Sequence, residues 1–186
     1  MNKVAFLLSC LIAGPALATS LEIEVAGEAN GTITIDLLED VAPQHAEQIA
    51  SLAAEGAYDC VVFHRVIDGF MAQTGDVKNG RMGSDDFDMR RAGTGGSDRP
   101  NLPAELSNLS FERGVVGMAR SRELDSANSQ FFIMFDRADA LNGKYTIVGT
   151  VTDGMDVVDQ IKRGDDDANG AVMGEPDRMV KVTVID

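Results

Sequence analysis

Two short strand-like segments overlap the run Phe63-His64-Arg65-Val66-Ile67-Asp68-Gly69-Phe70-Met71-Ala72-Gln73-Thr74-Gly75-Asp76. Branched and aromatic residues dominate these segments, which cover 61–66 and 70–74, and such residues favour strands. Later segments have the same character: 114–119, 130–135 and 145–151. The middle of the chain therefore predicts a mainly β protein built from short strands.

Both ends of the chain add strands in which apolar and polar residues alternate. The run Leu21-Glu22-Ile23-Glu24-Val25 has this pattern, and residues 32–37 repeat it directly after Asn30-Gly31. Asn-Gly is typical of a hairpin turn, so we expect a hairpin with one face in water. Residues 179–185 alternate in the same way and predict the last strand.

Two other segments have helical spacing. Pro43 fits the first turn of a helix and Gly56 is a natural stop, which predicts a helix over about 43–55. A second helix is predicted over about 154–163, before Gly164. The residues between 76 and 110 form a long loop region rich in Gly, Asp, Arg and Asn, and a loop of this length suggests function.

This inventory is about eight strands and two helices, with no internal repeat and no linker, which fits one domain. A closed eight-stranded antiparallel barrel capped by the two α-helices satisfies it, because closure removes exposed strand edges. The interior of such a barrel is either filled by side chains or just wide enough for a small ligand. Two functional classes stay open: a filled barrel that works on its outer face, and a hollow carrier.

The amino terminus has the features of a secretory signal peptide. Met1-Asn2-Lys3 is positively charged, an apolar stretch follows from Val4 to Gly14, and Ala16-Leu17-Ala18 is a small-x-small cleavage site. The apolar stretch is too short to span a bilayer. We therefore expect a signal peptide over 1–18, a folded domain over 19–186, and a periplasmic or secreted protein that has no membrane attachment after cleavage.

Composition excludes several partners. The 186 residues carry a formal net charge of −14, whereas binding to nucleic acid phosphates needs a basic surface. Cys60 is the only cysteine left after the predicted cleavage, so no intramolecular disulfide can form. Two histidines and one cysteine are too few ligands for a structural zinc site. We expect a monomer without a metal or cofactor.

An acidic turn near the carboxyl terminus resembles half of a calcium loop. The run Asp165-Asp166-Asp167-Ala168-Asn169-Gly170 places oxygen-bearing side chains at relative positions 1, 3 and 5 and glycine at 6. Position 12 should be glutamate, but it is Pro176, and a strand follows where an EF-hand has a helix. A solvated acidic turn is favoured over a calcium site.

The run over 63–76 closely resembles the signature segment of the cyclophilin family of peptidyl-prolyl cis-trans isomerases. Other motifs support the resemblance in the right order: Gly93-Thr94-Gly95-Gly96, Gly117-Met118-Ala119, Ser129-Gln130-Phe131-Phe132-Ile133 and Leu141-Asn142-Gly143-Lys144-Tyr145-Thr146-Ile147-Val148-Gly149. The resemblance covers essentially all of 19–186. It implies a filled eight-stranded barrel with two capping helices, a groove on its outer face, and an isomerase that assists folding of exported proteins by binding their proline-containing segments.

Motif positions also imply the site residues. The resemblance gives catalytic roles to Arg65, Phe70 and Gln73. It gives substrate-binding roles to Met71, Ala119, Arg120, Gln130, Phe132, Leu141 and Tyr145, with Ala119 and Arg120 where the family's strand offers backbone contacts. Taken singly, an arginine is more often a surface residue and the apolar residues are more often core. His64 should point away from Arg65, so a buried, hydrogen-bonded histidine is favoured over a general base.

The chemistry of this set is coherent without proton transfer. Rotation about a prolyl bond breaks amide resonance and leaves a basic nitrogen. Arg65 can donate a hydrogen bond to that nitrogen, while the apolar side chains hold the proline ring. Gln73 orients Arg65 or binds a substrate backbone group and Gln130 fixes the flanking chain, unless both are simple surface amides. The alternative function is a non-catalytic proline-peptide-binding chaperone or scaffold, which would tolerate truncation of Arg65.

Two groove positions depart from the best-known eukaryotic cyclophilins. Ala140 stands where those proteins have tryptophan, and Tyr145 where they have histidine. Tyr145 can still close the pocket with an aromatic face. Loss of the indole removes a large contact and a donor, so we expect weak binding of cyclosporin while catalysis survives. Thr74 also replaces a glycine that is common at this position in the family. The resemblance therefore does not predict the backbone conformation at Thr74.

Overall fold

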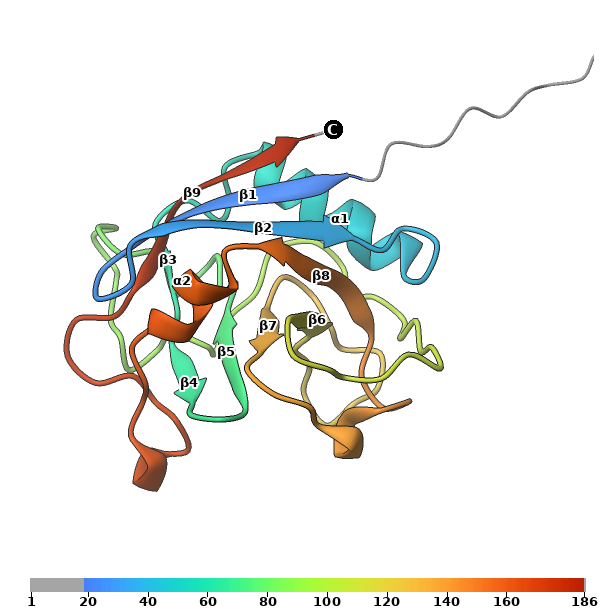
Figure 1. Ribbon diagram of the computed structural model, residues 1–186. Helices are drawn as coiled ribbons and strands as arrows, with labels where there is room; N and C mark the ends of the chain where they lie inside the picture. The colour runs from blue at the N-terminus through green and yellow to red at the C-terminus, as the bar shows by residue number, and fades with distance from the viewer. Residues whose placement is uncertain (1–18, 186) are drawn as a thin grey trace, which may run out of the picture.

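The computed structural model describes residues 19–185, so the predicted signal peptide lies outside the described residues. One antiparallel sheet of nine strands dominates the described residues, and its strand order is β3-β9-β1-β2-β8-β6-β7-β5-β4 (Figure 1). The strands are β1 (Ser20–Ala26), β2 (Gly31–Leu37), β3 (Val61–Val62), β4 (Arg65–Ile67), β5 (Met71–Thr74), β6 (Val115–Met118), β7 (Phe131–Met134), β8 (Ile147–Asp153) and β9 (Arg178–Ile185). The prediction of a mainly β protein is confirmed.

β1 and β2 form the predicted antiparallel hairpin. Ile23 stands opposite Ile33, and both are fully buried, while the acidic residues between the apolar positions of β1 are exposed. β9 pairs with the other side of β1, which brings the two ends of the described chain together (Figure 1). Alternation with period two therefore sets one face of this part of the sheet inward.

The expected closed eight-stranded barrel is wrong: the sheet is an open, strongly curled half-barrel of nine strands. The segment predicted as one strand over 61–66 is divided at Phe63 and His64. Its first part pairs with β9 and its second part with β5, so the two end strands of the sheet are adjacent in sequence without pairing with each other. A continuous run of branched residues does not reveal that its hydrogen-bonding partner changes halfway.

Loops cover both edges of this open sheet. At one edge, Val62 N donates to the carbonyl oxygen of Gly80 at 2.9 Å. At the other, Val66 N donates to the carbonyl oxygen of Gly170 at 2.7 Å, and Gly164 N donates to that of Val66 at 2.8 Å. The backbone groups that an open edge would leave for another chain are thus used internally.

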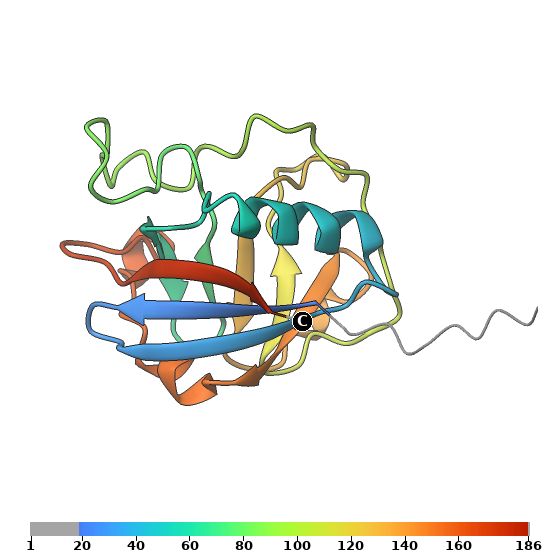
Figure 2. The same cartoon turned by 90° about the horizontal axis from the view of Figure 1, so that it is seen from above.

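Two α-helices occur within residues 19–185, α1 (Pro43–Ala54) and α2 (Met155–Gln160). α1 matches its predicted span, with proline in its first turn, and packs against β8 and β9 (Figure 2). α2 packs against β2 and ends earlier than predicted, because Ile161 has an extended backbone. The remaining helical turns are 3₁₀, η1 (Asp139–Leu141) and η2 (Asp166–Ala168).

Side chains from the inward sheet face and from both helices fill the interior. Leu21, Ile23, Ile35, Ile49 and Val158 are among its fully buried members. A second, smaller apolar cluster lies apart from this core, around Met71, Phe111 and Phe132. The filled interior favours the class of barrel that works on its outer face over the hollow carrier.

Candidate active site

Strand register places a row of residues on one face of β4, β5, β7 and β6. Arg65 stands opposite Gln73, Gln73 opposite Phe132, and Phe132 opposite Gly117. Because side chains alternate along a strand, the flanking residues of these strands point to the filled interior instead. The two halves of the run over 63–76 therefore bring Arg65 and Gln73 together on the outer face.

Phe132 forms the floor of this outer face. Its ring stacks on Phe111, with centroids 5.8 Å apart, and meets the edge of Tyr145 at 6.1 Å. A Cβ on Gly117 would lie 2.5 Å from the Phe132 ring, so the close approach requires glycine there. The sequence motifs did not identify Phe111, whose contribution depends on packing between distant segments.

A pocket of about 200 Å³ opens above Phe132; we call it the apolar pocket, because six of its nine lining residues are apolar or aromatic. It contains all the predicted site residues except Gln130: Arg65, Phe70, Met71, Gln73, Ala119, Arg120, Phe132, Leu141 and Tyr145. Arg65 lies at its margin and donates weakly from Nη1 to the sulfur of Met71 at 3.7 Å. A charged donor thus lies beside a pocket that can take a small apolar ring.

Hydrogen bonds hold the guanidinium of Arg65 at several atoms. Nη1 donates to Oε1 of Gln73 at 3.3 Å, Nε donates to the carbonyl oxygen of Asn169 at 3.0 Å, and Nη2 donates to Oδ1 of Asn169 at 3.0 Å. Burial lowers the pKa of Arg65, yet an arginine stays charged in proteins. Each terminal nitrogen carries two hydrogens, so Nη2 keeps an N–H to donate to a peptide.

Gln73 and Gln130 continue this network. Gln130 Nε2 donates to the carbonyl oxygens of Gly93 at 3.0 Å and Gly95 at 2.7 Å, which fixes the orientation of its amide. Its Oε1 then accepts from Gln73 Nε2 at 2.9 Å, so the Oε1 of Gln73 must face Arg65. The arrangement favours an orienting role for Gln73 over a simple surface amide.

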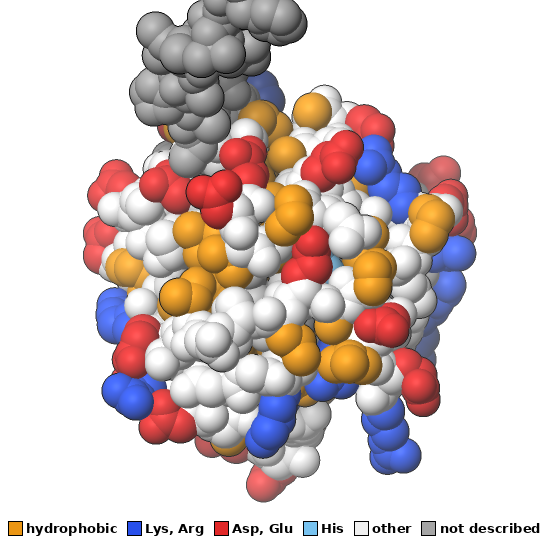
Figure 3. Space-filling model, turned by 90° about the vertical axis from the view of Figure 1, so that its right-hand side faces the viewer, with side chains coloured by type: hydrophobic (Ala, Val, Ile, Leu, Met, Phe, Trp, Pro, Cys, Tyr) orange, Lys and Arg blue, Asp and Glu red, His pale blue; other side chains and the backbone are white. Residues whose placement is uncertain are grey.

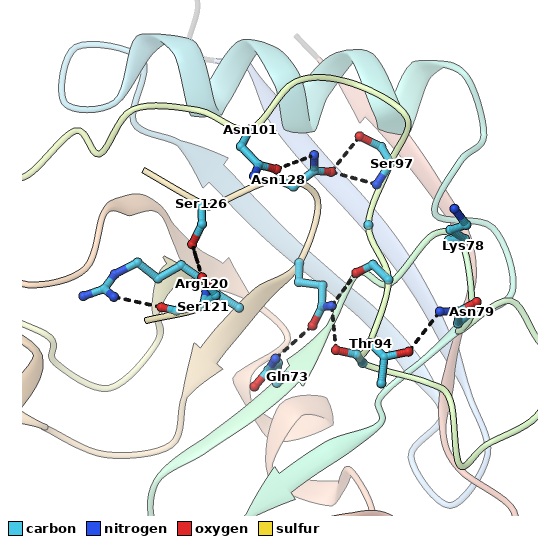
Figure 4. A pocket seen from close by; sticks show the side chains of 15 residues that line it. Gln73, Lys78, Asn79, Thr94, Ser97, Asn101, Arg120, Ser121, Ser126 and Asn128 are labelled. Carbon is cyan, nitrogen blue, oxygen red and sulfur yellow. Dashed lines mark hydrogen bonds between the residues drawn. The ribbon is translucent and has the colours of Figure 1, made fainter. Parts of the chain in front are cut away.

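A second pocket, of about 570 Å³, adjoins the first (Figure 4). Gln73, Ala119 and Arg120 line both pockets, whereas Gln130 lines only this one. Its walls are polar, with Asn79, Thr94, Ser97, Asn101, Ser121, Ser126 and Asn128 among the lining side chains. A peptide whose proline lies in the apolar pocket would therefore meet amides and hydroxyls on one side.

Arg120 forms a wall between the two pockets. Its guanidinium lies 4.4 Å above the Tyr145 ring and donates to the carbonyl oxygen of Lys144 at 2.9 Å. The neighbouring Ala119 N donates to the carbonyl oxygen of Gln130 at 2.9 Å, so that N–H is already used. Tyr145, which stands where the best-known eukaryotic cyclophilins have histidine, thus carries the guanidinium of Arg120 stacked on its ring.

His64 is buried, as predicted, and only 6% of its surface is exposed. Burial lowers its pKa to about 4, with a smaller opposing effect of Asp76. Gly93 packs directly on the ring. Within residues 19–185, neither ring nitrogen makes a hydrogen bond of regular geometry, although Val62 and Gln130 lie close enough to oppose the lowering of its pKa. His64 is a neutral packing residue rather than a base in the groove.

The acidic turn over 165–170 is placed beside Arg65 through Asn169. Across the described part of the chain, no group of three or more His, Cys, Asp or Glu residues is arranged to hold a metal ion. Its aspartates make this turn conspicuous in the sequence, whereas Asn169-Gly170 is the pair that contacts the groove strand. Asn-Gly is a signal for a left-handed turn and could have drawn attention to it.

Comparison with known proteins agrees with this geometry. The family model for cyclophilin-type peptidyl-prolyl cis-trans isomerases matches residues 20–184. A probable peptidyl-prolyl cis-trans isomerase of Brucella suis is 50% identical, over 97% of this chain and 97% of its own. Peptidyl-prolyl cis-trans isomerase B of Escherichia coli is 35% identical, over 72% of this chain and 79% of its own.

A solved structure has the same fold. The cyclophilin-type isomerase of Cryptosporidium parvum superposes with a TM-score of 0.74 at 22% identity, covering 91% of this chain and 99% of its own. The structure of that protein in the presence of the dipeptide Ala-Pro gives a TM-score of 0.73 at 23% identity, covering 90% and 99%. The chain belongs to the cyclophilin family and is an enzyme of the peptidyl-prolyl cis-trans isomerase type.

Proposed function

We propose that the apolar pocket holds the proline ring of a peptide and that Arg65 donates a hydrogen bond to the proline nitrogen as the prolyl bond twists. The single observation that carries this proposal is the guanidinium fixed by Gln73 and Asn169 at the margin of the pocket. The donor is aimed before substrate arrives, so little reorganisation is needed during rotation. The related structure determined in the presence of the dipeptide Ala-Pro supports a proline-containing partner.

The energetics favour this assignment. The planar amide resists rotation by about 18–20 kcal/mol, and rotation localises the lone pair on nitrogen. A hydrogen bond to that lone pair is stronger in the twisted state than in the planar one, which is the condition for catalysis. An acceleration of about five powers of ten needs about 7 kcal/mol, which orientation and one well-placed charge can supply.

Exchange NMR on an Ala-Pro peptide tests the role of Arg65. Catalytic amounts of the parent should accelerate cis-trans exchange, and Arg65→Ala should lower kcat/KM by about a hundredfold or more. Peptide binding should change much less, because the apolar pocket remains. An Arg65→Ala variant that isomerises as fast as the parent would refute the assignment. A parent that binds without accelerating exchange would instead support the non-catalytic scaffold.

We further propose that the protein is exported to the periplasm and assists folding of exported proteins there. The charged start, short apolar stretch and small-x-small site over 1–18 support this placement. Expression in a Gram-negative host should give periplasmic protein that begins at Thr19, as read by mass spectrometry. Ala18→Asp should block cleavage. Parent protein that stays in the cytoplasm with residues 1–18 attached would contradict the proposal.

We also propose that the protein is a monomer. Loops occupy the outer hydrogen-bonding groups of Val62 and Val66 at the two sheet edges. The face in Figure 3 supports this, because its hydrophobic side chains form small groups separated by charged and polar ones. A monomer of 19.8 kDa, less any cleaved leader, is expected by light scattering at micromolar concentration. A mass that doubles with concentration would contradict it.

A further inference from the structure

The loop over 164–171 lies along the edge of β4, the strand that carries Arg65. The hydrogen bonds of Val66 with Gly164 and Gly170 fix it there. A Cβ on Gly164 would collide with the backbone of Gly170, so the loop closes on itself only because residue 164 has no side chain. The position of this loop relative to Arg65 is therefore determined by backbone contacts.

Asn169 has a left-handed backbone conformation, with φ of 55°, at the end of η2. Asparagine and glycine adopt this conformation more readily than other residues. Glycine at position 169 would satisfy the backbone equally well, so the turn alone does not require a carboxamide. The carboxamide has a separate use, because its oxygen accepts the 3.0 Å hydrogen bond from Nη2 of Arg65.

The bonds to Arg65 are arranged to stop rotation of its guanidinium. Asn169 binds Nε through its carbonyl oxygen and Nη2 through its side chain, while Gln73 binds Nη1. Rotation about the Nε–Cζ bond would break the bonds at Nη1 and Nη2. The acceptors are neutral, so they orient the cation without forming an ion pair that would weaken its action on a substrate.

Asn169 acts from outside the groove, since it lines neither of the two pockets beside Arg65. We propose that Asn169 is a positioning residue for the isomerase, whose carboxamide oxygen aims the remaining Nη2 hydrogen of Arg65 into the apolar pocket. This inference rests on the proposed role of Arg65. It also gives the 165–170 turn a function that does not involve a cation.

Asn169→Gly is the sharpest test, because it keeps the left-handed turn and the main-chain acceptor while removing the carboxamide. We expect kcat/KM for an Ala-Pro peptide to fall by about tenfold, mainly through kcat, with KM changed by less than about twofold. The matched control is Asp166→Ala in the same loop. Asp166 is exposed, and the hydrogen bonds of Arg65 go to Asn169, Met71 and Gln73 instead, so this variant should keep full activity.

NMR of the arginine guanidinium provides a readout that a purely structural role would not change. In the parent, rotation about Nε–Cζ of Arg65 should be slow, giving separate Nη1 and Nη2 signals. In Asn169→Gly the rotation should accelerate until the signals merge, while the melting temperature stays near that of Asp166→Ala. Fast rotation of Arg65 in the parent would overturn the proposal, even if the variant failed to fold.

A double-mutant cycle separates this inference from the role of Arg65. If Asn169 acts only through Arg65, adding Asn169→Gly to Arg65→Ala should cause no further loss of kcat/KM. Full additivity of the two losses would overturn the positioning role. Activity retained in Arg65→Ala would refute the role of Arg65 itself. Loss in Arg65→Ala with unchanged activity in Asn169→Gly would refute only the role of Asn169.

Discussion

His64 and Arg65 are neighbours in sequence, yet His64 is buried and Arg65 is partly exposed, and pH affects the two side chains differently. Arg65 stays charged at any pH at which the protein folds. Burial lowers the pKa of His64 to about 4, so its ring is neutral at physiological pH. Neither group changes charge between pH 6 and 8, and we expect kcat/KM to be flat over this range.

The stability of the protein should depend on pH through His64. In the unfolded chain its pKa is about 6.5, so between pH 6.5 and 4 the unfolded state binds more protons than the folded state. Stability is therefore full above about pH 6.5 and falls as pH decreases, with a loss of about 3 kcal/mol from this group by pH 4. Urea unfolding at several pH values measures the slope.

His64→Gln is the control, since it removes the titrating ring and should flatten the part of the slope that His64 causes. Direct NMR titration of the ring gives the same information without a variant. A His64 pKa near 6.5 in the folded protein would contradict the prediction.

Ala140 is exposed in η1, next to Leu141 at the rim of the apolar pocket. We expect the parent to bind cyclosporin weakly, and Ala140→Trp to bind it at least about tenfold more tightly, because burying an indole contributes about 1–3 kcal/mol. Inhibition of peptide isomerisation measures both affinities. Ala140→Ser is the size-matched control, and equal inhibition of all three proteins would contradict the explanation.

The residues of the candidate site were predictable because each belongs to a short motif whose order along the chain is specific. The contacts that hold these residues in place were not predictable. Asn169 contacts Arg65 across a separation of 104 residues, and Phe111 stacks on Phe132 from a loop without a recognisable motif. Such contacts depend on where loops cross the sheet, which local sequence patterns do not encode.

Asp76 organises the long loop region between β5 and β6. Its carboxylate is fully buried and accepts four backbone N–H groups, those of Lys78 and Asn79 at Oδ1 and those of Gly93 and Gly95 at Oδ2. The same glycines present the carbonyl oxygens that hold Gln130. One side chain thus links the loop region to the network that ends at Arg65.

Asp76→Asn should destabilise this region, because an amide nitrogen would face two buried N–H groups in place of an acceptor oxygen. The expected loss is about 2–4 kcal/mol in the free energy of unfolding, with a lower kcat/KM as Gln130 loses its orientation. Denaturant unfolding and hydrogen exchange at Gly93 and Gly95 measure the effect. Asp86→Asn, at an exposed position of the same loop region, should change stability by less than about 0.5 kcal/mol.

Elements were predicted well where periodicity was local and poorly where partners changed. The hairpin of β1 and β2 follows from strict alternation around Asn30-Gly31, and α1 follows from its proline and apolar spacing. The division of the segment over 61–66 depends on two different partners, β9 and β5, which meet it only in the folded chain. This one division turns the expected closed barrel of eight strands into an open sheet of nine.

For the whole molecule, an open sheet creates a problem that a closed barrel avoids, because its edges can pair with another chain. The loop over 164–171 serves two purposes at one of these edges: it occupies the backbone of Val66, and it presents Asn169 to Arg65. Protection of the edge and activity should therefore be lost together. Gly164 is the point at which to test this, since even a methyl group there would collide with the backbone of Gly170 and Ala171.

Gly164→Ala should displace the loop from β4. We expect kcat/KM to fall by at least about tenfold, and we expect self-association that grows with concentration as the β4 edge becomes available. Light scattering and exchange NMR on the same samples measure both effects, with Asp166→Ala as the control that leaves the loop in place. A Gly164→Ala protein that is monomeric and fully active would show that neither the edge nor Arg65 depends on this loop. If Gly164→Ala loses activity but stays monomeric, Arg65 depends on this loop and protection of the β4 edge does not.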